Sequence, residues 1–342
     1  MRLLIIRTSA MGDVALTTPV LRAVRQQYPD AEMVFLTRPA FRPFFNSITG
    51  LNPFFIDLKV RHKGFRGLIR LFSDLSCTGK FDRVIDLHDV LRSQVLRTLF
   101  RLRGVQCFVI DKGRREKRKV IAGRKKTRVR HTVERYFDTF AKAGFPLEMT
   151  SGPWIVPSHE SVAGITSLTA SDNVLQVGVA PYAMHKLKLW PEEFMIRLLQ
   201  MISEKHLAEF FLFGANEEAE KLNVFKDKVP GSHNMAGKLN LEEELALMSR
   251  LDLMIAMDSS NMHMATLSGI KVVSVWGGTD PLCGFGAWQQ TEEYSVSIPI
   301  DHLTCRPCTI FGKGECRRGD LACMNWLTPE IVLAKIDNLK IW

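Results

Sequence analysis

Residues 2–13, Arg-Leu-Leu-Ile-Ile-Arg-Thr-Ser-Ala-Met-Gly-Asp, are the stretch that decides the fold. Residues 2–7 predict a short buried strand, because four apolar residues stand between two arginines. A loop of small residues follows, and apolar residues at helical spacing then predict a helix that ends at Tyr28-Pro29. Since residues 32–36 predict a second strand, the chain opens as strand, loop, helix and strand, the repeating unit of a parallel α/β sheet.

The same alternation continues along the 342 residues and restarts in the second half. A stretch at 144–173 that contains proline and glycine predicts a domain boundary. Before it we expect a strand at 81–87 and helices near 91–100 and 132–143. After it we expect strands at 174–179, 209–213, 253–256 and 271–275, with helices at 191–205, from about 217, at 241–250 and from about 260.

We therefore expect an α/β fold with two facing, Rossmann-like, doubly wound domains and a central cleft. Residues 1–160 would form the N-terminal, acceptor-binding domain, and residues 170–325 the C-terminal, nucleotide-sugar-binding domain. Residues 326–342 hold a last helix, expected at 329–339. The sequence leaves open whether this helix packs back on the N-terminal domain.

Composition narrows the class of protein. Apolar residues make up 46% and charged residues 24% of the chain, which is typical of a globular protein and excludes disordered and collagen-like chains. No apolar run approaches the length of a membrane span, and a charge at residue 2 argues against a signal peptide, so we expect a cytoplasmic protein. A net charge of +10 favours anionic partners.

Several common catalytic motifs do not occur. The sequence has no G-x-G-x-x-G, no Walker loop, no H-E-x-x-H and no G-x-S-x-G. It also lacks an Asp-x-Asp pair of the kind that holds a divalent cation on a nucleotide-sugar diphosphate. Metal-dependent phosphate chemistry is therefore disfavoured.

The first motif that carries chemistry is Ser9-x-x-Gly12-Asp13, directly after the first strand. In a doubly wound sheet, ligands bind at the carboxyl ends of the strands. Gly12 allows a close approach of the backbone to a ligand, and the Asp13 carboxylate can take a proton from a hydroxyl group. The same aspartate can instead cap the following helix, and the two roles are compatible.

The second motif lies at 180–191, after the first strand of the second half. It carries His185, Lys186 and Lys188, and then Trp-Pro opens a helix. A lysine in a cleft can neutralise charge that grows on a diphosphate leaving group. The alternative is a solvated basic loop.

The third motif lies at 256–266, where a strand ends at Asp258-Ser259-Ser260 and a helix begins. Free N–H groups and the helix dipole at such an N-terminus can bind phosphate, although either serine can simply cap the helix. His263 falls in the first turn, where a lone histidine is more often structural than catalytic. A glycine turn at 276–281 follows the next strand beside the same expected cleft.

These motifs together resemble the ADP-heptose:lipopolysaccharide heptosyltransferase family, glycosyltransferase family 9. The resemblance is carried, in chain order, by Ser9-x-x-Gly12-Asp13, Lys188-x-Trp190-Pro191, Met235-Ala236-Gly237-Lys238, Asp258-Ser259-x-x-x-His263-x-Ala265 and Trp276-Gly277-x-Thr279-Asp280-Pro281. They span residues 2 to about 330. The resemblance implies a GT-B fold and an inverting, metal-independent transfer of heptose from ADP-heptose to the lipopolysaccharide core, with no cofactor required.

The resemblance also implies the role of individual residues. Asp13 would be the general base on the acceptor hydroxyl group, and Lys188 would hold the donor diphosphate. Asp258 would bind sugar hydroxyl groups. The other implied donor-binding residues are Ser9, Gly12, Met235 near the nucleobase, Ser259, Ser260 and His263 around the phosphates, and Glu217 at the ribose, with its alignment against Glu218 left open.

The chain departs from the family pattern in two places. The family often has Gly-Pro after the acidic residue of the third motif, where this chain has Ser259-Ser260-Asn261. Tyr182 replaces a more usual glycine after Pro181. These changes put the identity of the donor in doubt more than the fold. A transferase of the same fold for another nucleotide sugar or glycan is therefore the alternative.

A basic run at 112–130 holds eleven Lys and Arg residues and one Glu. It predicts a surface for a lipid-linked saccharide acceptor or for the inner face of the cytoplasmic membrane, through Arg114, Arg115, Lys117 and Arg118. A mobile solvated loop is the plainer alternative. Nucleic acid is not expected, because the run lacks aromatic residues for stacking. A non-catalytic protein that binds an anionic surface or nucleic acid is the second alternative function.

Four of the seven cysteines cluster near the C-terminus. The spacing of Cys305-x-x-Cys308, followed by Cys316 and Cys323, suits a structural zinc knuckle, and reduced thiols without metal are the alternative. The segment lies beyond the motifs for donor chemistry, so any metal would be structural and not catalytic.

Overall fold

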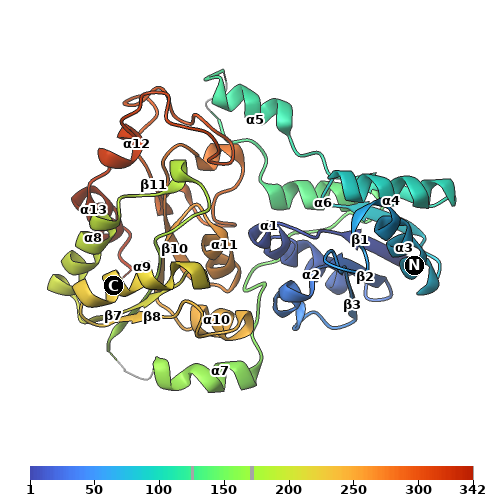
Figure 1. Ribbon diagram of the computed structural model, residues 1–342, viewed down its shortest axis with the longest axis horizontal. Coiled ribbons are helices and arrows are strands. Elements are labelled where there is room, and N and C mark those ends of the chain that lie inside the picture. Colours follow the sequence, from blue (N-terminus) through green and yellow to red (C-terminus); the bar gives the residue numbers. More distant parts are fainter. Residues whose placement is uncertain (125–126, 170–172, 342) are drawn as a thin grey trace. The chain divides into compact units, whose positions relative to one another are not determined.

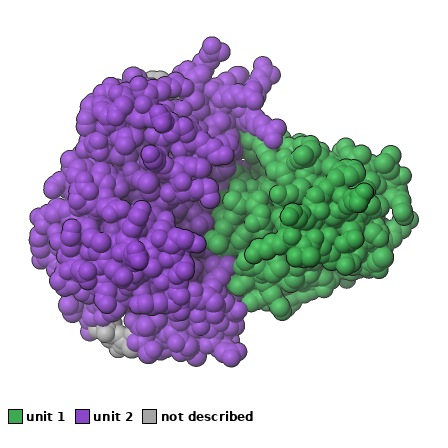
Figure 2. Space-filling view, in the orientation of Figure 1, with its two compact units in different colours: residues 1–112, 132–155 green, residues 113–131, 156–342 purple. Residues whose placement is uncertain are grey.

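The computed structural model describes residues 1–124, 127–169 and 173–341. These residues divide into two compact units, one of 1–112 and 132–155 and the other of 113–131 and 156–342 (Figure 2). Each unit is a parallel α/β sheet with helices packed against it (Figure 1). The expected restart of the strand–helix pattern is thus confirmed.

Unit 1 is built on a five-stranded sheet of order β3-β2-β1-β4-β5. Its strands are β1 (Arg2–Ile6), β2 (Glu32–Thr37), β3 (Leu51–Phe55), β4 (Arg83–Asp86) and β5 (Gln106–Val109). Its helices are α1 (Met11–Ala15), α2 (Thr18–Gln27), α3 (Gly64–Cys77), α4 (Leu91–Leu102) and α6 (Thr132–Lys142), with a 3₁₀ helix η1 (Pro39–Phe45). Strand order reverses between β1 and β4, which is where ligands bind in this fold.

The β1 strand is covered on both faces. Leu4 and Ile6 lie in one apolar cluster with side chains of α3 and α4. Because side chains alternate along a strand, the equally buried Leu3 and Ile5 point to the opposite face of the sheet. An apolar run without alternation is typical of a strand buried in this way.

Unit 2 is built on a six-stranded sheet of order β11-β10-β9-β6-β7-β8. Its strands are β6 (Leu175–Ala180), β7 (Ala208–Leu212), β8 (Ser232–Asn234), β9 (Leu253–Met257), β10 (Lys271–Val275) and β11 (Ser295–Val296). Its helices are α5 (Arg114–Ile121), α7 (His159–Ile165), α8 (Glu192–Lys205), α9 (Ala219–Lys228), α10 (Leu241–Met248), α11 (Ser260–Leu267), α12 (Ala322–Asn325) and α13 (Pro329–Asn338). Here the order reverses between β6 and β9.

Two segments group differently from the expected division of the chain. The basic segment 113–131 lies within the expected range 1–160 but clusters with unit 2, because Val120 and Val129 pack on Cys283. The C-terminal helix α13 also belongs to unit 2, where it packs beside α8 and its residue Asp337 accepts a hydrogen bond from Lys205 at 2.7 Å. The expected start of the second domain, residue 170, lies outside the described residues.

Within the described ranges, no helix combines the length and hydropathy that crossing a bilayer requires.

Candidate functional site

The candidate site of unit 1 lies where β1 ends. Arg7 follows the strand directly and is buried, and its guanidinium group donates to the Leu87 carbonyl oxygen at 2.7 Å. A second nitrogen of the same group lies 2.6 Å from the Asp13 carboxylate. Asp13 sits in the first turn of α1, and its own carbonyl oxygen accepts a hydrogen bond from Tyr136 at 3.1 Å. Its carboxylate is therefore held in one position at the point where the strand order reverses.

The structure does not place Asp13 at the cap position of the helix. The helix begins at Met11, and the cap position is Ala10, which has no polar side chain to cap it. The expected loop of small residues thus passes into helix earlier than its composition suggests. The predicted long helix is divided into α1 and α2, because Pro19 occupies the first turn of a second helix.

His88 was not singled out in the sequence, and it lies in the same place after β4. Its Nδ1 lies 3.2 Å from the Thr8 hydroxyl and its Nε2 lies 3.2 Å from the Ser9 hydroxyl. Burial, reinforced by the positive charges of Arg7 and Lys112, lowers the pKa of His88 to about 3. The ring is therefore neutral at pH 7 and fixes the Ser9 loop through hydrogen bonds rather than through charge.

In the candidate site of unit 2, two of the predicted residues form an ion pair. Lys188 Nζ lies 2.8 Å from Asp258 Oδ2, and the same oxygen accepts a hydrogen bond from Thr279 at 2.8 Å. Asp258 is buried and follows β9, while Lys188 ends the 3₁₀ turn η3 (Lys186–Lys188) after β6. An ammonium group has three donors, so Lys188 can hold Asp258 and still donate to a bound anion.

The N-terminus of α11 adjoins this ion pair in the sequence. Ser259 is the cap residue, and its buried hydroxyl group has no hydrogen-bond partner in the part of the chain that the structure describes. Ser260 opens the helix and is half-buried, and His263, three residues later, is buried. A free hydroxyl group beside unsatisfied backbone N–H groups is the arrangement that a phosphate oxygen fits.

Met235 and Glu217 lie on the β7–β8 side of the same sheet. Met235 is buried directly after β8, and its N–H donates to the Leu212 carbonyl oxygen at 3.0 Å. The Glu218 carboxylate accepts a hydrogen bond from the Ala215 N–H at 2.7 Å, so its side chain is held against its own turn. Glu217, in the same 3₁₀ turn η4 (Asn216–Glu218), is exposed.

Arg306 is a buried cation that the sequence analysis did not identify as part of the site. Its guanidinium group donates to the carbonyl oxygens of Gly277 at 2.6 Å and Thr279 at 3.2 Å, and it lies 3.3 Å from the Asp280 carboxylate. These contacts fix the glycine turn that presents Thr279 to Asp258. No simple sequence signal marks Arg306, because its contacts with the glycine turn join it to residues that lie more than 25 positions earlier.

The basic helix α5 is anchored by one of its own lysines. Arg114, Arg115 and Arg118 are exposed, but Lys117 is only 5% exposed and its Nζ lies 3.8 Å from the centroid of the Phe285 ring. Lys117 therefore attaches the helix to unit 2 and adds little to its surface. Lys125 and Lys126 of the predicted basic run lie outside the described residues.

Comparisons with known proteins show which family this chain resembles in sequence and in structure. The family model for glycosyltransferase family 9 (heptosyltransferase) matches residues 69–309. The lipopolysaccharide core heptosyltransferase OpsX of Haemophilus influenzae is 23% identical over 297 residues, which are 82% of this chain and 80% of that protein.

Solved structures have the same fold. A family 9 glycosyl transferase from Veillonella parvula has a TM-score of 0.74 and 19% identity, covering 99% of this chain and 96% of that one. Escherichia coli heptosyltransferase WaaC, solved with ADP-2-deoxy-2-fluoro heptose, has a TM-score of 0.68 and 20% identity, covering 99% and 100%. The expected GT-B fold is confirmed. With a match over more than half of its length, the chain belongs to glycosyltransferase family 9.

Proposed function

We propose that the protein transfers heptose from ADP-heptose to a sugar hydroxyl group of the lipopolysaccharide core, on a lipid-linked acceptor at the inner face of the cytoplasmic membrane. The observation that carries the proposal is the Lys188–Asp258 ion pair beside the unpartnered Ser259 hydroxyl group. It supplies a cation, a sugar-binding carboxylate and a phosphate-binding helix end in one place. The similarity to OpsX, a lipopolysaccharide core heptosyltransferase, supports the choice of acceptor, and the similarity to WaaC, solved with ADP-2-deoxy-2-fluoro heptose, supports the choice of donor.

On the donor side, each charged group contacts a different part of the donor. Lys188 and the N-terminus of α11 bind the diphosphate and stabilise the negative charge that it gains as it leaves. Asp258 accepts hydrogen bonds from sugar hydroxyl groups, and Met235 and Glu217 contact the nucleoside. Because these groups supply the charge themselves, we propose that transfer needs no divalent cation, in keeping with the missing Asp-x-Asp pair.

On the acceptor side, Asp13 takes the proton as the acceptor oxygen bonds to the anomeric carbon. The bond from that carbon to the diphosphate oxygen breaks in the same displacement, which inverts the centre. Arg7 and Tyr136 hold the base in place, so the carboxylate does not need to be ordered during the reaction. Ser9 and Gly12, which the family resemblance assigns to donor binding, lie in the loop before α1 and in its first turn, beside this base in the sequence.

A turnover assay tests this proposal. The purified protein should convert ADP-heptose to ADP in the presence of a heptose-deficient lipopolysaccharide acceptor, at a rate that added Mg²⁺ leaves unchanged. ADP should also raise the melting temperature of the protein, because it binds only the folded chain. Turnover of a different nucleotide sugar alone would assign the alternative donor that Ser259-Ser260-Asn261 and Tyr182 allow. Absence of turnover and of ADP binding would overturn the proposal.

To reach a lipid-linked acceptor, the protein must bind the membrane surface. Unit 1 has an exposed surface whose composition suits such binding. Around the start of α3, three apolar side chains are exposed, Val60 by 80%, Phe65 by 68% and Ile69 by 47%. Five exposed basic residues flank them in the sequence, Lys59, Arg61, Lys63, Arg66 and Arg70, of which Arg61 is paired with Asp74 at 2.7 Å. Apolar side chains among basic ones match an anionic lipid surface, and each basic residue near it contributes about 1 kcal/mol.

We expect the double variant Phe65→Ser and Ile69→Ser to bind phosphatidylglycerol-containing vesicles about tenfold less tightly than the unchanged protein, because apolar burial in the bilayer is lost. Cosedimentation with vesicles measures this. Leu207→Ser, which removes an equally exposed side chain from unit 2, is the control and should bind as before. Equal binding by all three proteins would exclude this surface and leave Arg114, Arg115 and Arg118 as the proposed contact.

A further inference from the structure

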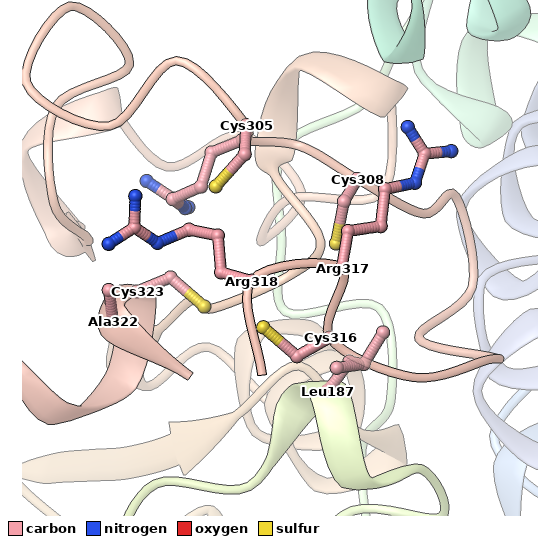
Figure 3. Close-up of a pocket in the computed structure, with 9 residues that line it drawn as sticks. Leu187, Cys305, Cys308, Cys316, Arg317, Arg318, Ala322 and Cys323 are labelled. Atoms are coloured by element: carbon pink, nitrogen blue, oxygen red, sulfur yellow. The ribbon is translucent and has the colours of Figure 1, made fainter. Parts of the chain in front are cut away.

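Four cysteine side chains, three from the loop between β11 and α12 and one from α12 itself, line a single small pocket. They are those of Cys305, Cys308, Cys316 and Cys323. Figure 3 shows that their sulfur atoms point toward one shared space. The cavity has a volume of about 20 Å³, which is room for one atom or ion and not for an organic ligand.

We propose that these four cysteines bind one zinc ion as thiolates. Zinc favours four-coordinate, tetrahedral sites of this composition, and Cys-x-x-Cys is a common spacing in them. Binding exchanges the four thiol protons for the ion, so it releases protons and involves no oxidation. Among the described residues, no group of three or more metal-ligating side chains already has the geometry of a metal site. The four sulfur atoms must therefore move inward to bond the ion.

The charges around the pocket fit a thiolate site. One divalent cation with four thiolates leaves a net charge of −2. Three arginines, Arg306, Arg317 and Arg318, line the same pocket. Arg306 is buried and fixed by its backbone contacts, so its positive charge is permanently in place beside the sulfur atoms. Arg306 is paired with Asp280 at 3.3 Å and Arg318 with Asp320 at 2.8 Å. The exposed Arg317 adds a further positive charge at the pocket, which thiolates would balance.

The metal would also position the donor site, an effect that rests on the proposed function. The Cys308 N–H donates to the Gly278 carbonyl oxygen at 3.0 Å, and the Gly278 N–H donates to the Leu187 carbonyl oxygen at 2.8 Å. Farther along the loop, Gly312 lies so close to Lys188 that a Cβ on it would stand 2.7 Å from Lys188 Cγ. A metal that holds this loop therefore holds the lysine that we propose for the diphosphate.

Metal analysis of the full chain, purified without chelator, tests the site. We expect about one zinc per chain, and a metal affinity at least 10–100-fold lower in Cys308→Ser and in Cys316→Ser, because each change removes a ligand. Cys77→Ser, which changes an exposed thiol of unit 1, should keep its zinc. Iron in place of zinc, lost in the same variants, would uphold the four-thiolate site and overturn the choice of metal. A chain without metal would overturn the site.

Thiol titration of the unchanged protein keeps the proposal testable if the variants fail to fold. Of the seven cysteines, four should become reactive only after a chelator removes the metal. Equal reactivity before and after chelation would reject the site. ADP affinity should fall about tenfold on chelation, and unchanged affinity would reject the positioning role. A zinc-loaded chain that binds no ADP would instead count against the proposed function and leave the metal site standing.

Discussion

Replacing Asp13 with asparagine should lower kcat by about 10²–10⁴-fold, the usual contribution of a general base. The amide keeps the shape of the side chain but cannot accept the acceptor's proton. Because Asp13 belongs to unit 1 and the proposed diphosphate contacts, Lys188 and the N-terminus of α11, belong to unit 2, the Kd for ADP should stay within about twofold. Initial rates and isothermal titration with ADP measure the two effects separately.

The control for Asp13→Asn is a change at Glu32, a carboxylate that also pairs with an arginine but lies at the opposite end of the sheet. Glu32 lies 2.8 Å from the guanidinium group of Arg2, at the amino end of the strands. Glu32→Gln removes an equal charge from an Arg pair without touching the site, and it should keep full activity. If Asp13→Asn weakened ADP binding as much as it lowered kcat, or if both variants lost activity equally, Asp13 would be a structural residue.

Strand and helix positions were largely predictable, because the central strands of both units are buried on both faces. Such strands read as continuous apolar runs, and these runs located β1, β6, β9 and β10. The edge strand β3 was not predicted, since Pro53 stands in its middle. A proline is tolerated at an edge, where one side of the strand needs no hydrogen bonds, but it removes the local signal for a strand.

The residue types of the candidate site were predictable, but most of their contacts were not. Polar residues after buried strands identified Asp13, Lys188 and Asp258 separately. The pairing of Lys188 with Asp258 joins residues 70 positions apart, and only the adjacency of β6 and β9 creates it. Arg7 carried a usable signal, because it directly follows β1, whereas its link to Asp13 depends on how α1 turns back.

Lys188→Ala is expected to weaken the binding of ADP by about 10–150-fold, the equivalent of one charge-assisted hydrogen bond of 1.5–3 kcal/mol. The loss has two parts. The diphosphate loses a cation, and Asp258, which is buried, keeps its negative charge without the ammonium group 2.8 Å away. That uncompensated carboxylate then repels the incoming diphosphate. Titration with ADP and the rate of heptose transfer both report the change.

A double variant separates the two parts of this loss. Asp258→Asn added to Lys188→Ala removes the repulsion, so ADP affinity should recover in part while transfer stays slow, because the leaving group still lacks its cation. Lys186→Ala is the matched control, since Lys186 lies in the same 3₁₀ turn but is exposed. If Lys186→Ala weakened ADP binding as much as Lys188→Ala, the loop would act through its overall charge, and the assignment of the diphosphate contact to Lys188 would be wrong.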